Sequence, residues 1–338
     1  MVTSPSRARP ALSIVIPAPS DTTALEETLV SVLENRPPDC EIVVALGCEY
    51  GDPWNIGDEV RFVHAPPGSS LVGCTNLGVA ASSASVVHIL AEGWLATEGW
   101  TDAAMARLAA GGIGVVVPVG LSPDDRDTIV SAGIRRTMGG RRVPVVSERK
   151  PLRLSSFVEA SCRAPMGPVL QAGFWRADVL AMAGPGFSTA CGDANADADI
   201  VAAVAAMGMD VVLEPASRVI AGGERRTSSA FTAGLHAERL FWRSLAGTAL
   251  VPALVLHAAE IVRHAAAVAP LGTLPMLAGR LAGAMQFGSC LARARQLESI
   301  RRQSQAATPV RTVRQDEPHA PITTPHQDVR TTPLKRSA

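Results

Sequence analysis

The first 120 residues alternate short apolar runs with stretches of helical spacing. Apolar, β-branched runs, the pattern of buried strands, lie at 12–17 (LSIVIP), 41–46 (EIVVAL), 60–64 (VRFVH), 85–90 (SVVHIL) and 113–119 (IGVVVPV). Between them, 23–35, 71–82 and 99–110 have helical spacing. Because strands and helices alternate, we predict an α/β fold whose doubly wound, mixed sheet is mostly parallel.

In such a sheet, ligands bind beyond the carboxyl ends of the strands. Three of these ends follow Pro17, Leu46 and Leu90. Any chemistry is therefore expected first in the loops after these residues.

The second half of the chain predicts a hairpin, further α/β elements and then helices. The hairpin spans 129–146 and turns near Gly139 and Gly140, while helices are expected at 228–247, 248–269 and 274–303. We divide the chain into a flexible N-terminus (1–10), a main domain (11–247), a helical extension (248–303) and a disordered tail (304–338). Residues 301–338 carry seven Lys or Arg and three Asp or Glu, together with five prolines, so the tail is mildly basic.

One apolar segment of the extension, 245–259, raises the question of a membrane. It contains Pro252 and His257, and charged residues follow from Glu260. This run is shorter than the roughly 20 apolar residues of a spanning helix. A helix packed on the domain and a helix lying on a membrane surface both fit it better than a span.

Composition excludes several classes of protein. The 338 residues have a formal net charge of zero, 47% hydrophobic residues, and only 5 Trp, 1 Tyr and 7 Phe, which argues against nucleic acid as a partner. No P-loop or dinucleotide-binding fingerprint occurs in the sequence. The six cysteines form no CxxC pair and no metal-ligand spacing, so we expect reduced thiols, a cytoplasmic protein and no structural zinc.

From about 12 to 243, the order of several segments resembles the family 2 inverting glycosyltransferases, which have the GT-A fold. SIVIP with LEETLVSVLEN is similar to the family's first strand and helix, and CTNLGVAAS to its Ala-Arg-Asn-x-Gly helix start. HILAEGWLATEGW lies where the DXD motif belongs, QAGFWRADVLAMAG where the acceptor-side segment belongs, and ADADIVAAVAAMG where the acidic catalytic pair belongs. The resemblance implies a GT-A-like fold and sugar transfer from a nucleotide-diphosphate sugar to a saccharide or lipid-linked acceptor.

The departures from the family pattern all concern the donor side. Ala45 stands where a carboxylate contacts the base, Thr75 replaces the arginine, and Ala91 and Gly93 occupy the two DXD positions around Glu92. A single carboxylate does not supply the several oxygen ligands that Mg²⁺ or Mn²⁺ requires. We therefore assign no metal site, although the resemblance implies one of these ions as the cofactor.

The resemblance nevertheless implies a set of site residues. Asp197 aligns with the catalytic base, which takes the proton of the acceptor hydroxyl. The candidate donor-binding residues are Pro17, Asn76, Glu92, Arg239 and Arg243. Guanidinium groups can neutralise a diphosphate without a metal, and Arg225 and Arg226 are further candidates for that role. Other carboxylates that can substitute for the missing ones are Glu49, Asp52 and Asp58.

Structural explanations compete with these roles. Asp193, Asp197 and Asp199 can serve a helix start by capping and by matching its dipole, and Arg239 and Arg243 share a helix face that can simply pack. His88 is interpreted as a core or rim residue, and Trp94 and Trp100 as core or lid aromatics, with sugar stacking as the weaker alternative.

Two functions remain open: a glycosyltransferase with altered or no metal dependence, and a catalytically inactive GT-A-like pseudoenzyme that acts as a binding or scaffold module. Contact of the C-terminal helices and basic tail with an anionic inner membrane surface is a further hypothesis.

Overall fold

The computed structural model describes residues 9–146, 152–157, 164–184, 186–222 and 228–307. The expected flexible start and most of the expected tail lie outside these ranges, as do Arg225 and Arg226.

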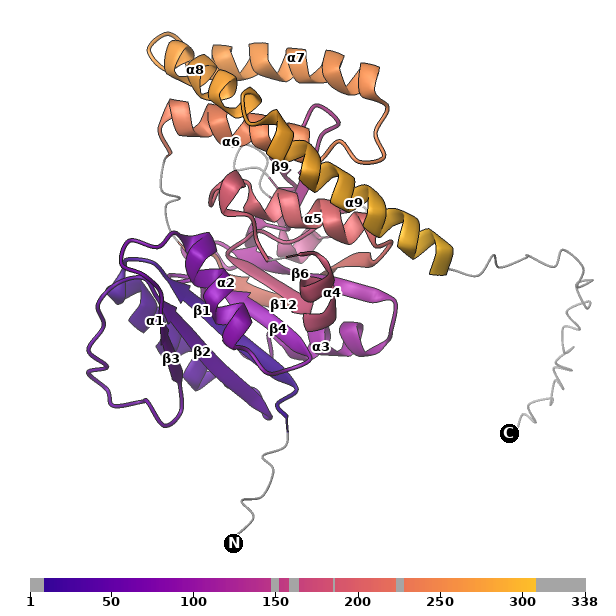
Figure 1. Cartoon of the computed structure of the whole chain (residues 1–338). Coiled ribbons are helices and arrows are strands. Elements are labelled where there is room, and N and C mark those ends of the chain that lie inside the picture. Colours follow the sequence, from indigo (N-terminus) through magenta and orange to yellow (C-terminus); the bar gives the residue numbers. More distant parts are fainter. Residues whose placement is uncertain (1–8, 147–151, 158–163, 185, 223–227, 308–338) are drawn as a thin grey trace, which may run out of the picture.

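The first half of the sheet is parallel, as predicted. Its strands lie in the order β4, β1, β2, β3, and β1 pairs in parallel with both β2 and β4. Their bounds are β1 (Leu12–Ala18), β2 (Cys40–Leu46), β3 (Arg61–His64) and β4 (Val86–Leu90). Helices α1 (Thr22–Glu34) and α2 (Leu71–Ala81) connect these strands (Figure 1). The side chains of β1 are buried throughout, as expected for a strand that is covered on both faces.

The second half of the sheet is mixed. Strand β11 lies antiparallel between β4 and β6, and β12 runs parallel to β6. The bounds here are β5 (Leu95–Ala96), β6 (Ile113–Leu121), β7 (Thr128–Ser131), β10 (Leu152–Arg153), β11 (Ala172–Arg176) and β12 (Asp210–Ile220), with helices α3 (Asp102–Ala109) and α4 (Ala177–Met182).

A buried aromatic cluster joins the two halves of the sheet. His88 stacks on Phe174 across β4 and β11, with ring centroids 3.8 Å apart, and its Nε2 accepts a hydrogen bond from Trp100 Nε1. Burial lowers the pKa of His88 to about 3, although a hydrogen bond with the Gly173 carbonyl opposes the shift. His88 is therefore a neutral core residue. Trp94 and Trp100 are also buried, so all three interpretations as core residues are confirmed.

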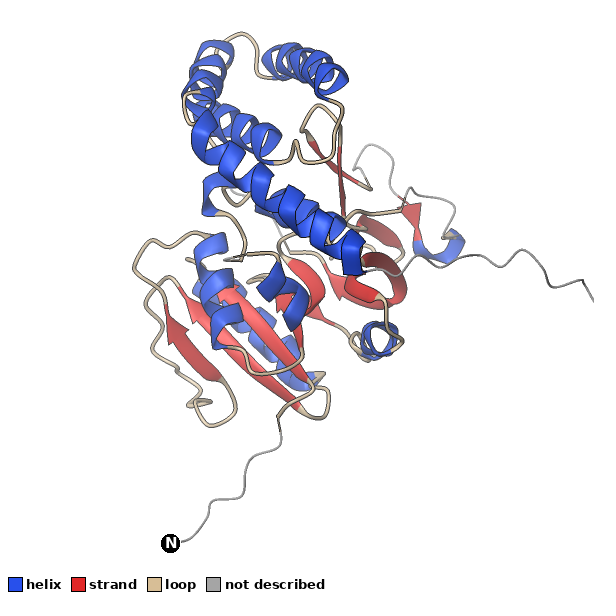
Figure 2. Cartoon of the chain, turned by 45° about the vertical axis from the view of Figure 1, so that its right-hand side comes forward, coloured by secondary structure: helices blue, strands red, loops and turns tan. Residues whose placement is uncertain are grey.

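The predicted hairpin forms outside the main sheet but is shorter than expected, because residues 129–131 belong to β7 of the main sheet. Strands β8 (Ile134–Arg136) and β9 (Arg142–Pro144) form a separate two-stranded sheet, in which Ile134 also makes an isolated bridge with Gly167, and they extend toward the C-terminal helices (Figure 2). The turn between them contains Gly139 and Gly140, as expected.

Five further helices follow along the described chain. They are α5 (Ala196–Ala206), α6 (Ala230–Arg243), α7 (Leu250–Ala267), α8 (Thr273–Ala284) and α9 (Phe287–Ala307). Helices α6 to α9 pack mainly on one another and on α5. The expected helix 274–303 is in fact two, α8 and α9. In addition, α9 continues to Ala307, past the expected start of the tail.

Helices α6 and α8 approach each other through glycines. A Cβ on Gly279 would lie 1.9 Å from the Phe231 carbonyl oxygen, and one on Gly234 would lie 2.1 Å from the Met276 carbonyl oxygen. The absence of side chains therefore permits backbone contact between the two helices.

Helix α7 exposes most of its apolar residues. Its only buried residues are Ala253 and His257, while Val251 and Val262 are 71% and 70% exposed. It is the one helix of the described ranges that is long and apolar enough to cross a membrane. The helix does pack on the rest of the protein through Ala253 and His257, and His257 contacts the Gly139 carbonyl and Glu238.

Candidate functional site

The edge of the sheet after β1, β2 and β4 carries few functional groups. Ala45 and Ala91 are 0% and 2% exposed, and Pro17 lies buried in β1 beside Ala45 in the strand register. The Glu92 amide donates to the Pro17 carbonyl, so these two candidates are adjacent. This edge therefore presents alkyl groups where the family pattern has carboxylates.

The Glu92 side chain turns to the start of α1. One of its oxygens accepts from the backbone amides of Asp21 (3.1 Å) and Ser20 (3.4 Å). A carboxylate at this position satisfies amides that lack a helical partner and interacts favourably with the helix dipole.

A second carboxylate occupies the start of α2. Asp193 accepts from the amides of Leu71 (3.3 Å) and Val72 (3.0 Å). Nearby, the Asn76 side chain makes two hydrogen bonds with the backbone of Phe187, each 2.8 Å long. Asp193 therefore serves a helix start, but that of α2 and not, as expected, that of the alanine-rich helix that follows it in sequence.

Asp197, the predicted catalytic base, lies in a closed ion pair. It is 1% exposed, and Arg142 of β9 approaches it with Nη2 at 2.6 Å and Nε at 2.8 Å. The amides of Leu170 and Ala198 also donate to the carboxylate. Burial would lower the pKa of Arg142, but the charge of Asp197 and its hydrogen bonds with the guanidinium group together raise that pKa. Both carboxylate oxygens are therefore fully engaged by protein groups.

The two candidate arginines of α6 join the helices to one another. Arg243 binds Asp199 of α5 with Nε at 2.7 Å. Arg239 donates to the Ala190 carbonyl and to the Gln286 side chain. The structure thus brings Pro17 and Glu92 together at the sheet edge and places Arg243 beside α5, but it engages each polar candidate in contacts within the protein. Their assignment as site residues stays a prediction.

The residues present do not fit a metal ion. Within the described ranges, no group of three His, Cys, Asp or Glu side chains is placed to hold one. Of the substitute carboxylates, Asp52 accepts from the Ile56 amide of its own loop.

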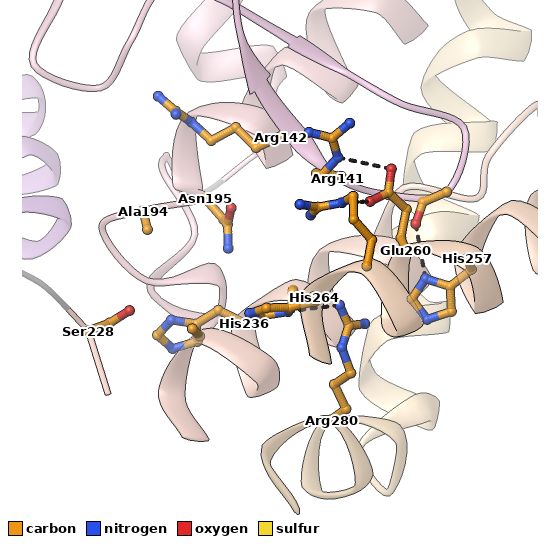
Figure 3. Close-up of a pocket in the computed structure, with 15 residues that line it drawn as sticks. Arg141, Arg142, Ala194, Asn195, Ser228, His236, His257, Glu260, His264 and Arg280 are labelled. Atoms are coloured by element: carbon orange, nitrogen blue, oxygen red, sulfur yellow. Dashed lines mark hydrogen bonds and ion pairs between the residues drawn. The ribbon is translucent and has the colours of Figure 1, made fainter. Parts of the chain in front are cut away.

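A cavity of about 210 Å³ lies between the β8–β9 hairpin, the loop before α5 and helices α6 to α8 (Figure 3). We call it the cap cavity. Its lining contains Gly139, Gly140, Arg141, Arg142, Ala194, Asn195, Ser228, Ala233, His236, Ala237, His257, Glu260, Arg263, His264 and Arg280. Sequence reasoning did not identify it.

One carboxylate of the cap cavity is shared by two guanidinium groups. Glu260 Oε1 accepts from Arg141 at 2.9 Å, and its Oε2 accepts from Arg263 at 2.6 Å (Figure 3). Burial would raise the pKa of Glu260, but these hydrogen bonds outweigh it and lower it. Glu260 is therefore ionised at neutral pH.

A second shared carboxylate lies behind the cavity wall. Glu238 of α6 accepts from His257 of α7 at 3.0 Å, from Arg280 of α8 at 3.0 Å and from Trp242 at 2.8 Å. Burial would raise the pKa of Glu238, but these hydrogen bonds and the His257 charge lower it. The second ring nitrogen of His257 faces the Gly139 carbonyl at 2.9 Å. Because both nitrogens face acceptors, the geometry fits an imidazolium, and Glu238 holds three helices together.

One signal in the sequence could have revealed the cap cavity. His257, Glu260 and His264 recur at i, i+3 and i+7, which is a polar stripe within an apolar helix. A stripe of this kind on the buried face indicates that the helix packs against polar or charged partners.

The comparisons with known proteins show the fold alone. No protein-family model and no curated protein matches the chain. Among solved structures, GalNAc-T7 with UDP, GalNAc and Mn²⁺ is 13% identical with a TM-score of 0.54, and the match covers 85% of this chain and 57% of that one. S. aureus TarS 1–349 in complex with UDP is 13% identical with a TM-score of 0.52, and the match covers 89% and 93%. The chain therefore has a GT-A-like fold, which confirms the predicted fold class, and it spans little more than half of the GalNAc-T7 chain.

Proposed function

We propose that this protein is a GT-A-like binding module that does not transfer sugar from a metal-bound nucleotide sugar. The observation that carries the proposal is the pairing of Asp197 with Arg142, in a carboxylate that is 1% exposed. A general base must come within hydrogen-bonding distance of the proton that it removes. Here both oxygens already accept from Arg142 or backbone amides.

The sheet edge supports the same proposal. Departure of a nucleoside diphosphate develops negative charge, which a divalent cation normally stabilises. Ala91 and Gly93 supply no carboxylate for such an ion, and Glu92 serves the start of α1. The starts of α1 and α2, which are potential phosphate sites, are occupied by Glu92 and Asp193.

The test is nucleotide release from the full chain. The purified protein is incubated with UDP- and GDP-sugars, with Mn²⁺ or with a chelator, and free UDP and GDP are measured by chromatography. We expect no release above a protein-free control. Release by the wild type that is abolished in Asp197→Asn but retained in Asp199→Asn would overturn the proposal. The two variants are matched, because both carboxylates are buried in α5 and paired with an arginine.

One observation favours a metal-independent glycosyltransferase as the second candidate. Arg142 both holds Asp197 and lines the cap cavity, where Arg141, Arg263 and Arg280 also lie. Guanidinium groups can neutralise a departing diphosphate in place of a metal. Release that is unchanged by the chelator and lost in Asp197→Asn would select this candidate.

We also propose that α7 and α8 contact the surface of an anionic membrane from the cytoplasmic side. Leu274, Leu281 and Met285 form an outward stripe on α8 and are 77%, 66% and 82% exposed. Together with Val251 and Val262 of α7, they make an aliphatic surface, which suits the acyl region beneath lipid headgroups.

The test of membrane contact is flotation of the full chain with vesicles of phosphatidylcholine and phosphatidylglycerol. The double variant Leu274→Gln/Leu281→Gln is expected to lose most of the floated fraction. Val30→Gln is the control, because Val30 is an exposed apolar residue (51%) on the distant helix α1. Equal flotation of the wild type and the double variant would reject the proposal.

A further inference from the structure

The cap cavity gathers positive side chains from separate elements. Arg141 and Arg142 come from the hairpin, Arg263 and His264 from α7, and Arg280 from α8. Against these four guanidinium groups the lining contributes one carboxylate, Glu260. Two carboxylates outside the lining, Asp197 and Glu238, also pair with lining arginines. The four arginines still outnumber these carboxylates and Glu260 taken together.

One N–H group of the Arg280 guanidinium has no hydrogen-bond partner among the described residues. The residue is 7% exposed, and its Nε is buried without a hydrogen-bond partner among the described residues. Its Nη1 reaches Glu238 and its Nη2 reaches His264 Nδ1 at 3.2 Å. Buried donors in proteins nearly always have an acceptor, but this Nε is closed to solvent as well, so a ligand in the cavity would meet the more exposed guanidinium groups of the lining, of which Arg263 is half exposed.

His264 adds a donor from α7. Because its Nδ1 accepts from Arg280, the neutral ring carries its proton on Nε2. Burial and the charges of Arg280 and Arg263 lower the pKa of His264, so the imidazole is neutral when the cavity holds no anion. A bound anion would face N–H donors and no additional acceptor from this side chain.

We infer that the cap cavity binds a phosphate-type anion, as a phosphate monoester or a pyrophosphate group. Guanidinium groups donate parallel hydrogen bonds to phosphate oxygens, and a tetrahedral anion can accept from donors on several sides at once. The volume of about 210 Å³ lies below the roughly 300–1,000 Å³ of sites for drug-sized ligands. The cavity therefore suits the charged group of a ligand and is too small for a whole nucleotide sugar. This inference gives the proposed binding module its ligand class and rests on that proposal.

The experiment is calorimetric titration of the full chain with inorganic phosphate and with pyrophosphate at constant ionic strength, with chloride as the reference anion. Arg263→Gln is the test variant, because Arg263 is half exposed and its loss leaves Glu260 paired with Arg141. Arg302→Gln is the matched control: this arginine forms an exposed i, i+4 pair with Glu298 on α9, outside the cavity lining.

We expect saturable binding that Arg263→Gln weakens by about tenfold and Arg302→Gln changes by less than about twofold. Arg280→Lys keeps the charge but removes the planar guanidinium group and is expected to weaken binding as well, with circular dichroism confirming its fold. Absence of saturable binding, or equal weakening by Arg263→Gln and Arg302→Gln, would overturn the inference.

A measurement on vesicles distinguishes the two sources of the anion, a lipid headgroup and a soluble phosphate ligand. Flotation is measured on phosphatidylcholine vesicles that contain phosphatidic acid, whose headgroup is a phosphate monoester. Weaker flotation of Arg263→Gln than of Arg302→Gln supports a lipid headgroup as the source, and equal flotation with weakened phosphate binding supports a soluble phosphate ligand. Failure of phosphate binding without nucleotide release rejects only the cavity assignment, whereas nucleotide release rejects the proposed function.

Discussion

The sheet edge and the cap cavity differ in the charged groups that they carry and in how these groups are paired. At the sheet edge, Glu92 and Asp193 each satisfy the first amides of a helix. In the cap, guanidinium groups outnumber carboxylates, and the buried Arg280 Nε has no hydrogen-bond partner among the described residues. The comparison teaches that the fold does not by itself locate a binding site. In this chain, the helix starts at which the fold would place a ligand already bind carboxylates of the protein.

The largest expected effect comes from breaking the ion pair between the hairpin and α5, which borders the cap cavity. Asp197→Ala leaves the Arg142 guanidinium, whose side chain is 10% exposed, without its carboxylate. Removal of one partner of a buried pair costs about 3–5 kcal/mol of unfolding free energy. Urea denaturation followed by circular dichroism measures the loss. The double variant Asp197→Leu/Arg142→Met should recover much of it, and a single-variant loss below about 1 kcal/mol would show that the pair is not closed.

The cap should lose stability in acid through Glu238. Its pKa is lowered in the folded protein, so its contribution is present above the ordinary value near 4.5 and is lost as the pH falls through the lowered folded value. Glu238→Gln is expected to cost about 2–4 kcal/mol at pH 7 and to flatten the decline of stability below pH 4.5. Thermal denaturation from pH 7 to pH 3 is the measurement. Parallel curves for the wild type and the variant would contradict the role given to Glu238.

A smaller loss is expected when the contact between α6 and α8 is opened. Gly279→Ala places a methyl group against the Phe231 carbonyl oxygen, at a distance of 1.9 Å before relaxation, and should cost about 1–3 kcal/mol. Gly288→Ala is the matched control, because nothing lies within 4 Å of the added Cβ. Urea denaturation should separate the two variants, and equal stabilities would mean that the helices adjust without loss.

The smallest effect concerns the sheet edge. Glu92→Gln removes a charge from the start of α1 and should cost about 0.5–1 kcal/mol. Glu34→Gln, at the other end of the same helix, should cause no loss. The melting temperature of the wild type should not change with Mn²⁺. A rise with Mn²⁺ that disappears in Glu92→Gln would reveal a metal site and reverse the comparison.

Local patterns predicted the fold because the buried side chains of each strand or helix recur at a regular spacing within its own segment of sequence. Run 12–17 became β1, and the apolar spacing of Leu25, Leu29 and Val32 became the buried face of α1. The polar stripe of α7 was visible in the same way, but its meaning depended on which face is buried, and an isolated segment does not contain that information.

The state of the candidate site residues could not be read from the sequence. Asp197 pairs with Arg142 from a hairpin 55 positions earlier, and Asp193 caps a helix more than 120 positions earlier. Both contacts depend on how the hairpin and the sheet edge meet α5 and the loop before it. The cap cavity is similar, since its lining comes from the hairpin, the loop before α5 and the helices α6 to α8, which only tertiary packing brings together.

Arg142 lies between the cap cavity and Asp197 of α5, and this has a consequence for both. One side chain neutralises Asp197 and also lines the cap cavity. An anion that draws this guanidinium toward itself must loosen its hold on the carboxylate, and a rigid pair must in turn weaken the attraction for the anion. By thermodynamic reciprocity, the occupancy of the cap cavity and the accessibility of the Asp197 carboxylate are coupled through the single residue Arg142.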